Sequence, residues 1–220
     1  MVGGTGDEGY GLALRWAAHG YEIIIGSRTT DRAQAAAENI RKTLSRLPKV
    51  TGLVNQDAVL RADIVVLAVP FSGLVETIKA LKPHFKSGQT VVNVTVPLET
   101  TIGGRATRTL GLWDGSAGQL AARLLPKHVR LVTAFNNVSA AALNELSKPV
   151  ECDVLVCGDD EEAKKIVFEI GRAIPNVQCI DAGTLENSRT VEQLTALLVS
   201  LNVKYNIKNA GLRITGIQQS

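Results

Sequence analysis

Long apolar runs are missing from this sequence. Its longest apolar stretches, such as the one at 64–70, have the length of a strand, whereas a membrane-spanning helix needs about 20 residues. No segment with the charge and apolar pattern of a signal peptide precedes Gly3. These features argue against a membrane or secreted protein and predict a cytoplasmic one.

Cysteine is scarce, and its spacing fits neither a metal site nor a disulfide framework. The chain has Cys152, Cys157 and Cys179, an odd number without a CxxC pair. We expect them to be buried strand thiols in a reducing compartment, and we expect no bound metal.

The net positive charge is too small, and aromatic residues are too few, for a nucleic-acid-binding protein. The formal net charge is only +3, and aromatic residues make up 4% of the chain. This leaves little attraction for a polyanion and few surfaces on which bases could stack. We therefore expect no nucleic acid among the partners, and a small anionic molecule instead.

Glycine is concentrated near the start of the chain, where GGTGDEG occupies residues 3–9. Gly4, Gly6 and Gly9 have the G-x-G-x-x-G spacing. In this motif the first glycine makes a tight turn, the second lets backbone approach a pyrophosphate, and the third lets a helix pack close to its strand. A helix predicted at about 8–19 would direct its N-terminal amides at the phosphates. The motif predicts a dinucleotide-binding loop.

The residues after the next apolar strand, at 22–26, indicate which dinucleotide binds. An NAD-selective site places Asp or Glu there to hold the ribose hydroxyls, whereas this chain has Ser27 and Arg28, with Arg32 one turn later. A hydroxyl and two guanidinium groups suit the 2′-phosphate of NADP. The alternative is a glycine-rich turn and a surface arginine without a ligand, but the whole unit favours NADP.

Apolar strand-like runs alternate with amphipathic helical stretches, which is typical of a parallel sheet covered by helices on both faces. We predict an α/β fold with a Rossmann-type doubly wound, mostly parallel sheet and a smaller C-terminal part. The predicted strands are near Val2 and at 23–25, 50–54, 64–69, 90–94 and 130–134, and the predicted helices are at 8–19, 30–46, 72–82 and 116–125.

A second strand-helix-strand unit follows, with strands at 153–157 and 177–180 around a helix at 160–173. This unit either extends the first sheet or begins a smaller domain. The last helix, at 187–204, has an apolar stripe that predicts a core contact or the interface of a homodimer. We divide the chain into an NADP-binding Rossmann domain at 1–147 and a smaller C-terminal substrate-side domain at 148–220.

The first strand is short for this fold. Only Met1 and Val2 precede the glycine loop, although the first strand of a doubly wound sheet is central and strands are commonly about five residues long. The neighbouring strands would then lack backbone partners over part of their length. We expect the natural chain to begin a few residues earlier.

Ligands of doubly wound sheets bind beyond the carboxyl ends of the strands. Two predicted strands end in an X-Pro step, Val69-Pro70 and Val96-Pro97. Because proline fixes φ and pushes its predecessor into an extended conformation, these steps would leave both valines lining the nicotinamide. Each proline by itself could equally just end a strand. The glycine-rich segment at 99–118 is either a mobile flap over the cofactor or a passive surface excursion.

No side chain that would protonate a carbonyl is evident. Tyr205 and Lys208 are one residue too close for the Tyr-x-x-x-Lys pair of short-chain dehydrogenases, and the three histidines lie in helix-end or turn contexts that favour a surface role. The acidic run at 159–162 begins a predicted helix, where acids favour the dipole. This pattern predicts hydride transfer between two ring carbons, which requires orientation and exclusion of water and no catalytic side chain.

Seven stretches of the sequence match one known family. They are GGTGDEGYGLALRWAAHGYEIIIGSR, ADIVVLAVPF, VVNVTVPL, AFNNVSAAAL, CDVLVCGDDEEAKK, DAGTLENSRTVEQLTALLVSLNVKY and NAGLRITGI. The first is shared with many Rossmann reductases, whereas the C-terminal matches are specific. Along nearly its whole length the chain thus resembles the NADPH-dependent F420 reductases, or F420H2:NADP oxidoreductases. The resemblance implies a two-electron exchange between C4 of the nicotinamide and C5 of the 5-deazaflavin of coenzyme F420.

The resemblance also implies the residues of the site. After Phe135 many relatives carry histidine, whereas this chain has Asn136, which can donate a hydrogen bond to the deazaflavin but cannot titrate. A deazaflavin contact is implied for Ala210, within a stretch at 204–217 whose basic residues, Arg213 among them, could meet the F420 tail. The implied NADP contacts are Thr5, Gly6, Asp7, Glu8, Ser27, Arg28, Arg32, Val69, Gly73, Val96 and Ala140.

Two other functions stay open at this point. Pyrroline-carboxylate reductases share the glycine loop and the sheet, so the chain could be an NADPH-dependent reductase of a small imine or carbonyl. It could also be a non-catalytic NADP-sensing protein. An acid directed at the nicotinamide ring would favour the first alternative, and a blocked ring face would favour the second.

We predict a strong preference for NADP over NAD. The substitution Arg28→Ala removes a charge-assisted contact to the 2′-phosphate and should cost about 1.5–3 kcal/mol, or about ten- to a hundredfold in NADPH affinity, with a much smaller effect on NADH. Titration of each dinucleotide into the variant measures this difference. Equal kcat/KM values of the unmodified protein for NADH and NADPH would contradict the assignment.

Overall fold

The structure is a computed structural model that describes residues 1–44 and 48–217. Its strands are β1 (Ile23–Ser27), β2 (Val50–Val54), β3 (Ile64–Leu67), β4 (Thr90–Asn93), β5 (Arg130–Thr133), β6 (Cys152–Gly158) and β7 (Val177–Asp181). Its α-helices are α1 (Asp7–Ala18), α2 (Thr30–Thr43), α3 (Asn55–Arg61), α4 (Phe71–Leu81), α5 (Ala117–Leu124), α6 (Ala140–Asn144), α7 (Glu161–Arg172) and α8 (Ser188–Tyr205). Short 3-10 helices are η1 (Lys82–His84), η2 (Glu99–Ile102) and η3 (Leu185–Asn187).

The predicted alternation of strands and helices is confirmed, with two helices that the sequence pattern did not show. These are α3 and α6, with seven and five residues, which is too short for a clear helical period. The end of the helix predicted at 30–46 falls partly outside the described residues. None of the described helices is long and apolar enough to span a lipid bilayer.

The sheet is mostly parallel. β1 pairs with β2, and β3, β4 and β5 pair in that order, all in parallel. Bridges from Val2 to Gly26 and to Leu67 connect these two groups. β6 pairs antiparallel with β5 and parallel with β7, so the second strand-helix-strand unit extends the first sheet. The Rossmann-type α/β architecture is therefore confirmed.

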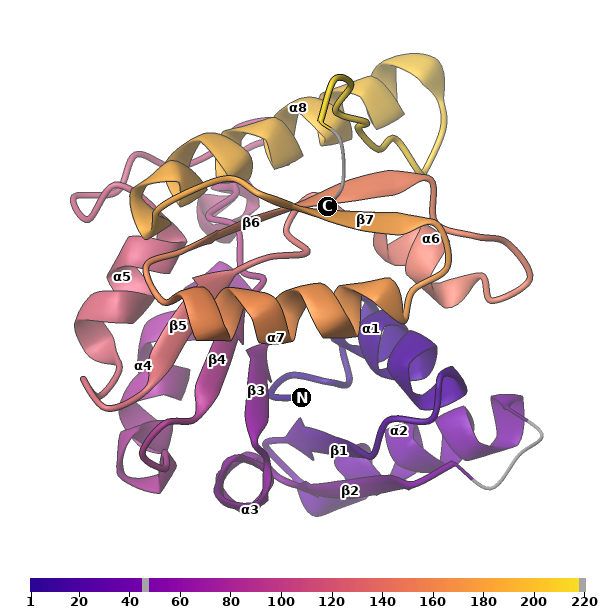
Figure 1. The fold of residues 1–220 in the computed structure, drawn as a ribbon, viewed down its shortest axis with the longest axis vertical. Coiled ribbons are helices and arrows are strands. Elements are labelled where there is room, and N and C mark those ends of the chain that lie inside the picture. Colours follow the sequence, from indigo (N-terminus) through magenta and orange to yellow (C-terminus); the bar gives the residue numbers. More distant parts are fainter. Residues whose placement is uncertain (45–47, 218–220) are drawn as a thin grey trace.

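Helices cover both faces of the sheet (Figure 1). On one face α1, α2 and α7 bury an apolar core that includes Leu12, Ile40 and Val167, and on the other face α3, α4 and α5 bury a second core around Leu74 and Ala121. Strand β4 is buried at all four positions, as expected for a parallel strand covered on both sides. This burial keeps the strands in fixed register. Their carboxyl ends, which form the candidate site, are therefore held in fixed positions.

A buried arginine couples α1 to the segment after β5. The guanidinium of Arg15, which is 3% exposed, donates to four carbonyl oxygens at 2.6–2.9 Å, those of Ala142, Leu143, Glu145 and Lys148. Some of these belong to the end of α6, where a helix leaves its carbonyls without partners. Arg15 therefore anchors residues 142–148 against the helix of the glycine loop.

The chain start lies inside the sheet. The Met1 amino group donates to the Ile24 carbonyl oxygen at 2.7 Å, and burial lowers its pKa to about 5. Beside it a cavity of about 370 Å³ opens between β1 and β3, with Ile23, Ile64 and Val66 in its wall.

Candidate functional site

The glycine loop packs directly on the carboxyl end of β3. The N–H of Gly4 donates to the Gly26 carbonyl oxygen at 3.2 Å, which ties the loop to β1. Gly3 has a φ of +76°, and a Cβ atom there would lie 2.5 Å from the carbonyl oxygen of Ala68. Only glycine tolerates both this conformation and this approach. The loop is thereby held at the sheet edge where doubly wound folds bind ligands.

Space for a phosphate lies beyond Gly6. This residue caps α1, with an extended backbone at φ −87°. A Cβ atom on it would meet the Gly3 carbonyl oxygen at 3.6 Å, an ordinary contact, so the outer side of the loop is open. The free amides and positive dipole end of α1 begin here. These features fit the pyrophosphate of a dinucleotide.

The proposed 2′-phosphate contacts lie between β1 and α2. Ser27 is the last residue of β1 and is 4% exposed. Arg28 follows it on the surface, and Arg32 is exposed in the first turn of α2. Asp31, also exposed, shares that turn, where a carboxylate favours the helix dipole. The two guanidinium groups and the hydroxyl are compatible with NADP.

A chain of hydrogen bonds joins the ends of β3, β4 and β5 to α8. The hydroxyl of Thr95 donates to the Val69 carbonyl oxygen at 3.1 Å, and the Asn136 amide nitrogen donates to the Thr95 carbonyl oxygen at 3.3 Å. The hydroxyl of Thr195, on α8, donates to the Asn136 carbonyl oxygen at 3.0 Å. The structure thus brings Val69, Val96 and Asn136 together. Thr95 and Thr195 complete this group and were missed, because the family stretches that contain them gave neither residue a role.

Two buried amide oxygens in this region have no hydrogen-bond partner among the described residues. They are Oδ1 of Asn136 and Oδ1 of Asn93, whose residues are 7% and 0% exposed. Since buried polar atoms normally find a partner, such atoms are candidates for ligand contacts. Asn93 was not predicted as a site residue, because its neighbours in β4 are apolar and the sequence there indicates only a buried strand.

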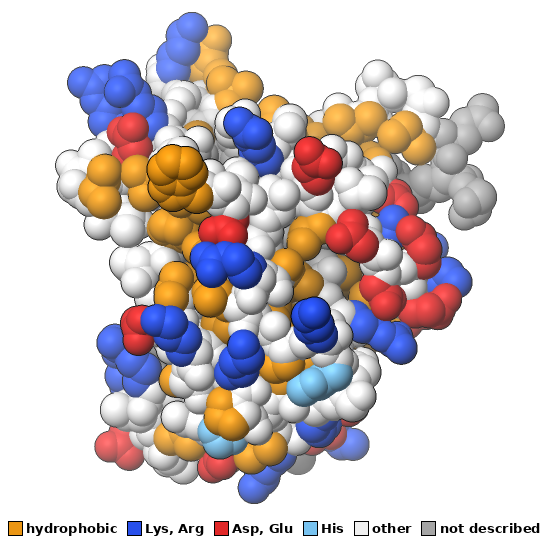
Figure 2. Space-filling view, turned by 90° about the vertical axis from the view of Figure 1, so that its left-hand side faces the viewer, with side chains coloured by type: hydrophobic (Ala, Val, Ile, Leu, Met, Phe, Trp, Pro, Cys, Tyr) orange, Lys and Arg blue, Asp and Glu red, His pale blue; other side chains and the backbone are white. Residues whose placement is uncertain are grey.

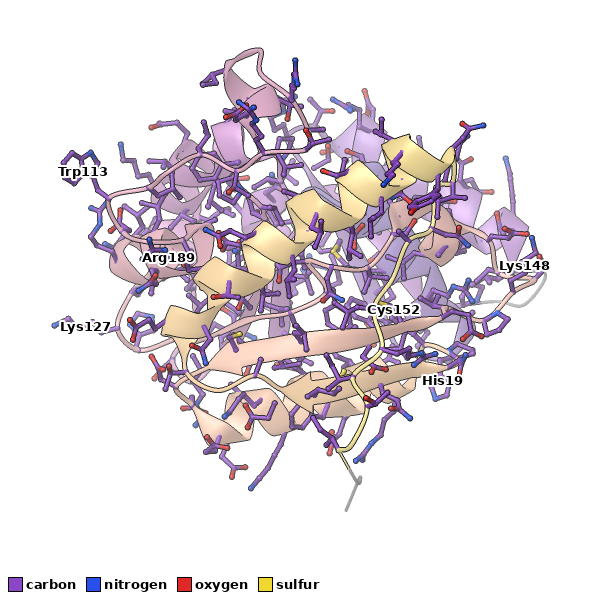
Figure 3. The ribbon with its side chains drawn as sticks, turned by 90° about the horizontal axis from the view of Figure 1, so that it is seen from above. His19, Trp113, Lys127, Lys148, Cys152 and Arg189 are labelled. Carbon is purple, nitrogen blue, oxygen red and sulfur yellow. The ribbon has the colours of Figure 1, made fainter. Side chains whose placement is uncertain are left out.

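The C-terminal segment folds back beside this region. Figure 3 shows it crossing the start of β6 near Cys152, where the Asp153 N–H donates to the Leu212 carbonyl oxygen at 2.8 Å. The hydroxyl of Ser139 donates to the Lys208 carbonyl oxygen at 2.6 Å. Half-buried Ala210 therefore lies on a segment that is attached to the loop between β5 and α6.

Arg213 has a structural role in this segment. Its guanidinium pairs with the buried carboxylate of Asp153 at 2.7 Å and with Glu151 at 3.1 Å. These partners raise the pKa of Arg213. The expectation that Arg213 contacts the F420 tail does not agree with this arrangement, because its charge is already compensated inside the protein.

Burial raises the pKa of two further carboxyl groups near the candidate site. Glu192 on α8 is 2% exposed and accepts hydrogen bonds from the amides of Ala117 and Gly118 at 2.9 and 3.0 Å, which ties α8 to the start of α5. Burial raises the pKa of Glu192 to about 7. Glu8, in the glycine loop, has one carboxyl oxygen buried without a partner among the described residues, and burial raises its pKa to about 8.

The glycine-rich segment at 99–118 is a surface excursion in this structure. Leu98 and Thr109 form an antiparallel bridge at its base, and Asp114 pairs with Arg123 at 2.6 Å. Trp113 is fully exposed and points away from the protein (Figure 3). Whether the segment moves over a cofactor stays a prediction.

The sequence predictions for the acidic run after β6 and for the three cysteines can also be compared with the structure. The acid run after β6 caps a helix as expected, since the Asp160 carboxylate accepts from the Ala163 N–H at 2.8 Å. Cys152 and Cys157 are buried in β6, and Cys179 is half-buried in β7. The described residues contain no cluster of three or more His, Cys, Asp or Glu side chains suited to a metal ion.

The fold and this loop define a Rossmann-type dinucleotide-binding protein. Residues 1–97 match the protein family described as NADP oxidoreductase, coenzyme F420-dependent. The chain is 45% identical to an F420-dependent NADP reductase of Methanocaldococcus jannaschii, over 99% of this chain and 98% of that protein. It is 42% identical to one of Methanothermobacter thermautotrophicus, over 100% and 95%. The chain therefore belongs to the F420-dependent NADP reductase family.

The solved structures agree on the fold. A crystal structure of a candidate F420-dependent NADP reductase from Arthrobacter sp. FB24 superposes with a TM-score of 0.80 at 22% sequence identity, covering 97% of each chain. The resemblance inferred from the sequence is thus confirmed at the level of family and fold. The individual contacts of the predicted site residues, including Thr5, Asp7, Gly73 and Ala140, stay predictions.

Substitutions at two glycines of the loop should affect different properties, one the binding of the dinucleotide and the other the stability of the fold. The substitution Gly6→Val should abolish dinucleotide binding without unfolding the protein, because the side chain enters open space that the pyrophosphate needs. The substitution Gly3→Ala should lower the free energy of unfolding by about 1–3 kcal/mol, because of its positive φ and its contact with Ala68. NADPH titration and urea denaturation of both variants measure these effects. Normal NADPH binding by folded Gly6→Val protein would refute the loop assignment.

Proposed function

We propose that this chain is an NADP-dependent F420 oxidoreductase, which transfers a hydride between NADP(H) and the 5-deazaflavin coenzyme F420. The observation that carries the proposal is the identity of 45% to an F420-dependent NADP reductase across 99% of the chain. The glycine loop, open beyond Gly6, fits the dinucleotide. The unpartnered amide oxygens of Asn93 and Asn136 fit a second ligand that offers N–H groups.

NADP(H) would be held along the strand ends. In this proposal Thr5 and Gly6 contact the pyrophosphate, and Arg28 and Arg32 neutralise the 2′-phosphate. Val69 and Val96 lie at the strand ends that face the nicotinamide half. The remaining proposed contacts of the cofactor are with Asp7, Glu8, Ser27, Gly73 and Ala140.

Residues 148–220 would supply the substrate side. We propose that Ala210, and Asn136 from the end of β5, contact the deazaflavin, with the small side chain of Ala210 allowing a planar ring to approach. When bound, NADPH supplies a hydride that F420 accepts. The protein needs only to orient the rings and to exclude water, so no side chain acts as acid, base or nucleophile.

We further propose a cytoplasmic homodimer whose partners are small molecules. Helix α8 and the turn that follows it expose Leu197, Val203, Tyr205 and Ile207, whose exposed fractions are 53, 72, 61 and 44%, which supports a subunit contact. Figure 2 shows the side on which α4 and α5 lie, where basic side chains are interspersed with apolar and acidic ones. Such a surface gives no support for binding to nucleic acid.

The test of the activity is anaerobic mixing of the protein with NADPH and F420. We expect the deazaflavin absorbance to disappear as F420 is reduced, with one NADPH consumed for each F420. The Gly6→Val variant serves as the control and should show no turnover. Oxidation of NADPH by an imine or carbonyl compound, with no reaction toward F420, would instead support the alternative reductase.

The substrate side is tested separately with Ala210→Phe. A ring at this half-buried position should hinder F420 by about 1–3 kcal/mol, or about five- to a hundredfold in its KM, while the Kd for NADPH stays unchanged. Ala80→Phe, at an exposed position of α4, is the matched control and should affect neither value. An unchanged KM for F420 in a folded Ala210→Phe protein would place the deazaflavin elsewhere.

A further inference from the structure

The carboxyl group of Glu8 has an unusual position. Glu8 is the second residue of α1, next to the glycine loop that is suited to bind a phosphate. A negatively charged side chain there would be repelled by the bound phosphate. The Oε1 atom of Glu8 is buried and has no hydrogen-bond partner among the described residues. Buried polar atoms without a partner are rare and call for an explanation.

The face of α1 that carries Glu8 packs against α6. Gly11 and Arg15 follow Glu8 by three and seven residues and so lie on the same helix face. A Cβ atom at Gly11 would lie 2.7 Å from Leu143, and Arg15 donates to the carbonyl oxygens at the end of α6. Glu8 therefore lies on the face of α1 that packs against α6, at the end of the helix nearest the glycine loop.

Few charges are available to compensate Glu8. The strand ends and loops at 64–75, 90–98 and 134–144 contain no ionisable side chain. The guanidinium of Arg15 is occupied by four carbonyl oxygens. On α1 itself the ionisable neighbours are Asp7, which is exposed, and Tyr10, which is half-buried.

The remaining cations lie on neighbouring elements. Arg28 and Arg32 are exposed at the start of α2, and Lys208 is exposed on the C-terminal segment. Burial accordingly dominates, and it raises the pKa of Glu8 to about 8. The raised pKa favours the protonated carboxyl, which carries one O–H donor.

We propose that Glu8 stays uncharged in the dinucleotide complex and donates a hydrogen bond to an oxygen of NADP(H), so that binding at alkaline pH takes up one proton. The inference rests on the proposed function and deepens it. Below the pKa of the free protein the donor is present and affinity is full. Above it, Glu8 must regain a proton from solvent on binding, so affinity falls about tenfold per pH unit until the pKa of the complex is reached.

The test is calorimetric titration of NADP⁺ between pH 7 and 9.5, in two buffers with different ionisation enthalpies. The range starts above the second pKa of a phosphate monoester, which is about 6. For the unmodified protein we expect a Kd that rises about tenfold per unit above pH 8, with proton uptake on binding. Glu8→Gln keeps an N–H donor that cannot ionise, so its Kd should be independent of pH and its proton uptake should disappear.

Two further variants separate the hydrogen bond from the charge. Glu8→Leu removes both and should bind about three- to tenfold more weakly than Glu8→Gln at pH 7, without pH dependence. Glu22→Gln removes an exposed carboxylate that lies before β1, outside the proposed site, and should keep the pH dependence of the unmodified protein. Thermal unfolding of each variant shows whether it is folded at the pH of the titration.

A Kd of the unmodified protein that is constant between pH 7 and 9.5 would overturn the inference. So would a folded Glu8→Gln protein that keeps the same pH dependence, because the titrating group would then lie elsewhere. Both results leave the proposed function intact, since NADP⁺ still binds. Failure of the unmodified protein to bind NADP⁺ at pH 7 would instead refute the proposed function together with this inference.

Discussion

The backbone of Met1 and Val2 is the constraint on which the rest of the structure depends. The Val2 N–H donates to the Val66 carbonyl oxygen at 2.8 Å, its carbonyl oxygen accepts from Ala68 at 2.9 Å, and the Met1 carbonyl oxygen accepts from Gly26 at 2.7 Å. These bonds align the carboxyl ends of β1 and β3. The chain must then turn at once against the end of β3, which its glycines permit. The direction of α1 and the place of Ser27 follow from this alignment.

Helix α1 transmits that alignment to the second half of the chain. Arg15 holds the end of α6 and the segment after it by its four carbonyl contacts. The indole N–H of Trp16 donates to the Ile170 carbonyl oxygen on α7 at 2.7 Å. The bonds between Thr95, Asn136 and Thr195 extend the connection to α8. The glycine-loop half and the C-terminal half of the chain are therefore joined largely by side chains that bond to backbone, which keeps their relative position well defined.

The charges are distributed in a way that suits hydride transfer between two rings. The arginines proposed for the 2′-phosphate lie on the surface beside β1, whereas the strand ends at 64–75, 90–98 and 134–144 carry no ionisable side chain. An uncharged environment excludes water and leaves the rings to react without proton transfer from the protein. Half-buried Glu8 and buried Glu192 lie near this region, and burial raises the pKa of Glu8 to about 8 and that of Glu192 to about 7. Both carboxyls can thus carry a proton at neutral pH.

The sequence by itself determined the parallel α/β architecture, the glycine loop, the NADP cofactor and the family. These features are local, because periodicity, turn residues and short motifs each depend on neighbouring positions. Tertiary structure alone decided that Arg15 is buried, that Thr195 meets Asn136, and that Arg213 is paired with Asp153. It also decided that the carboxyl of Glu8 is buried without a partner among the described residues. Such contacts join residues far apart in the chain, and a side chain's burial and pKa depend on what the whole fold places around it.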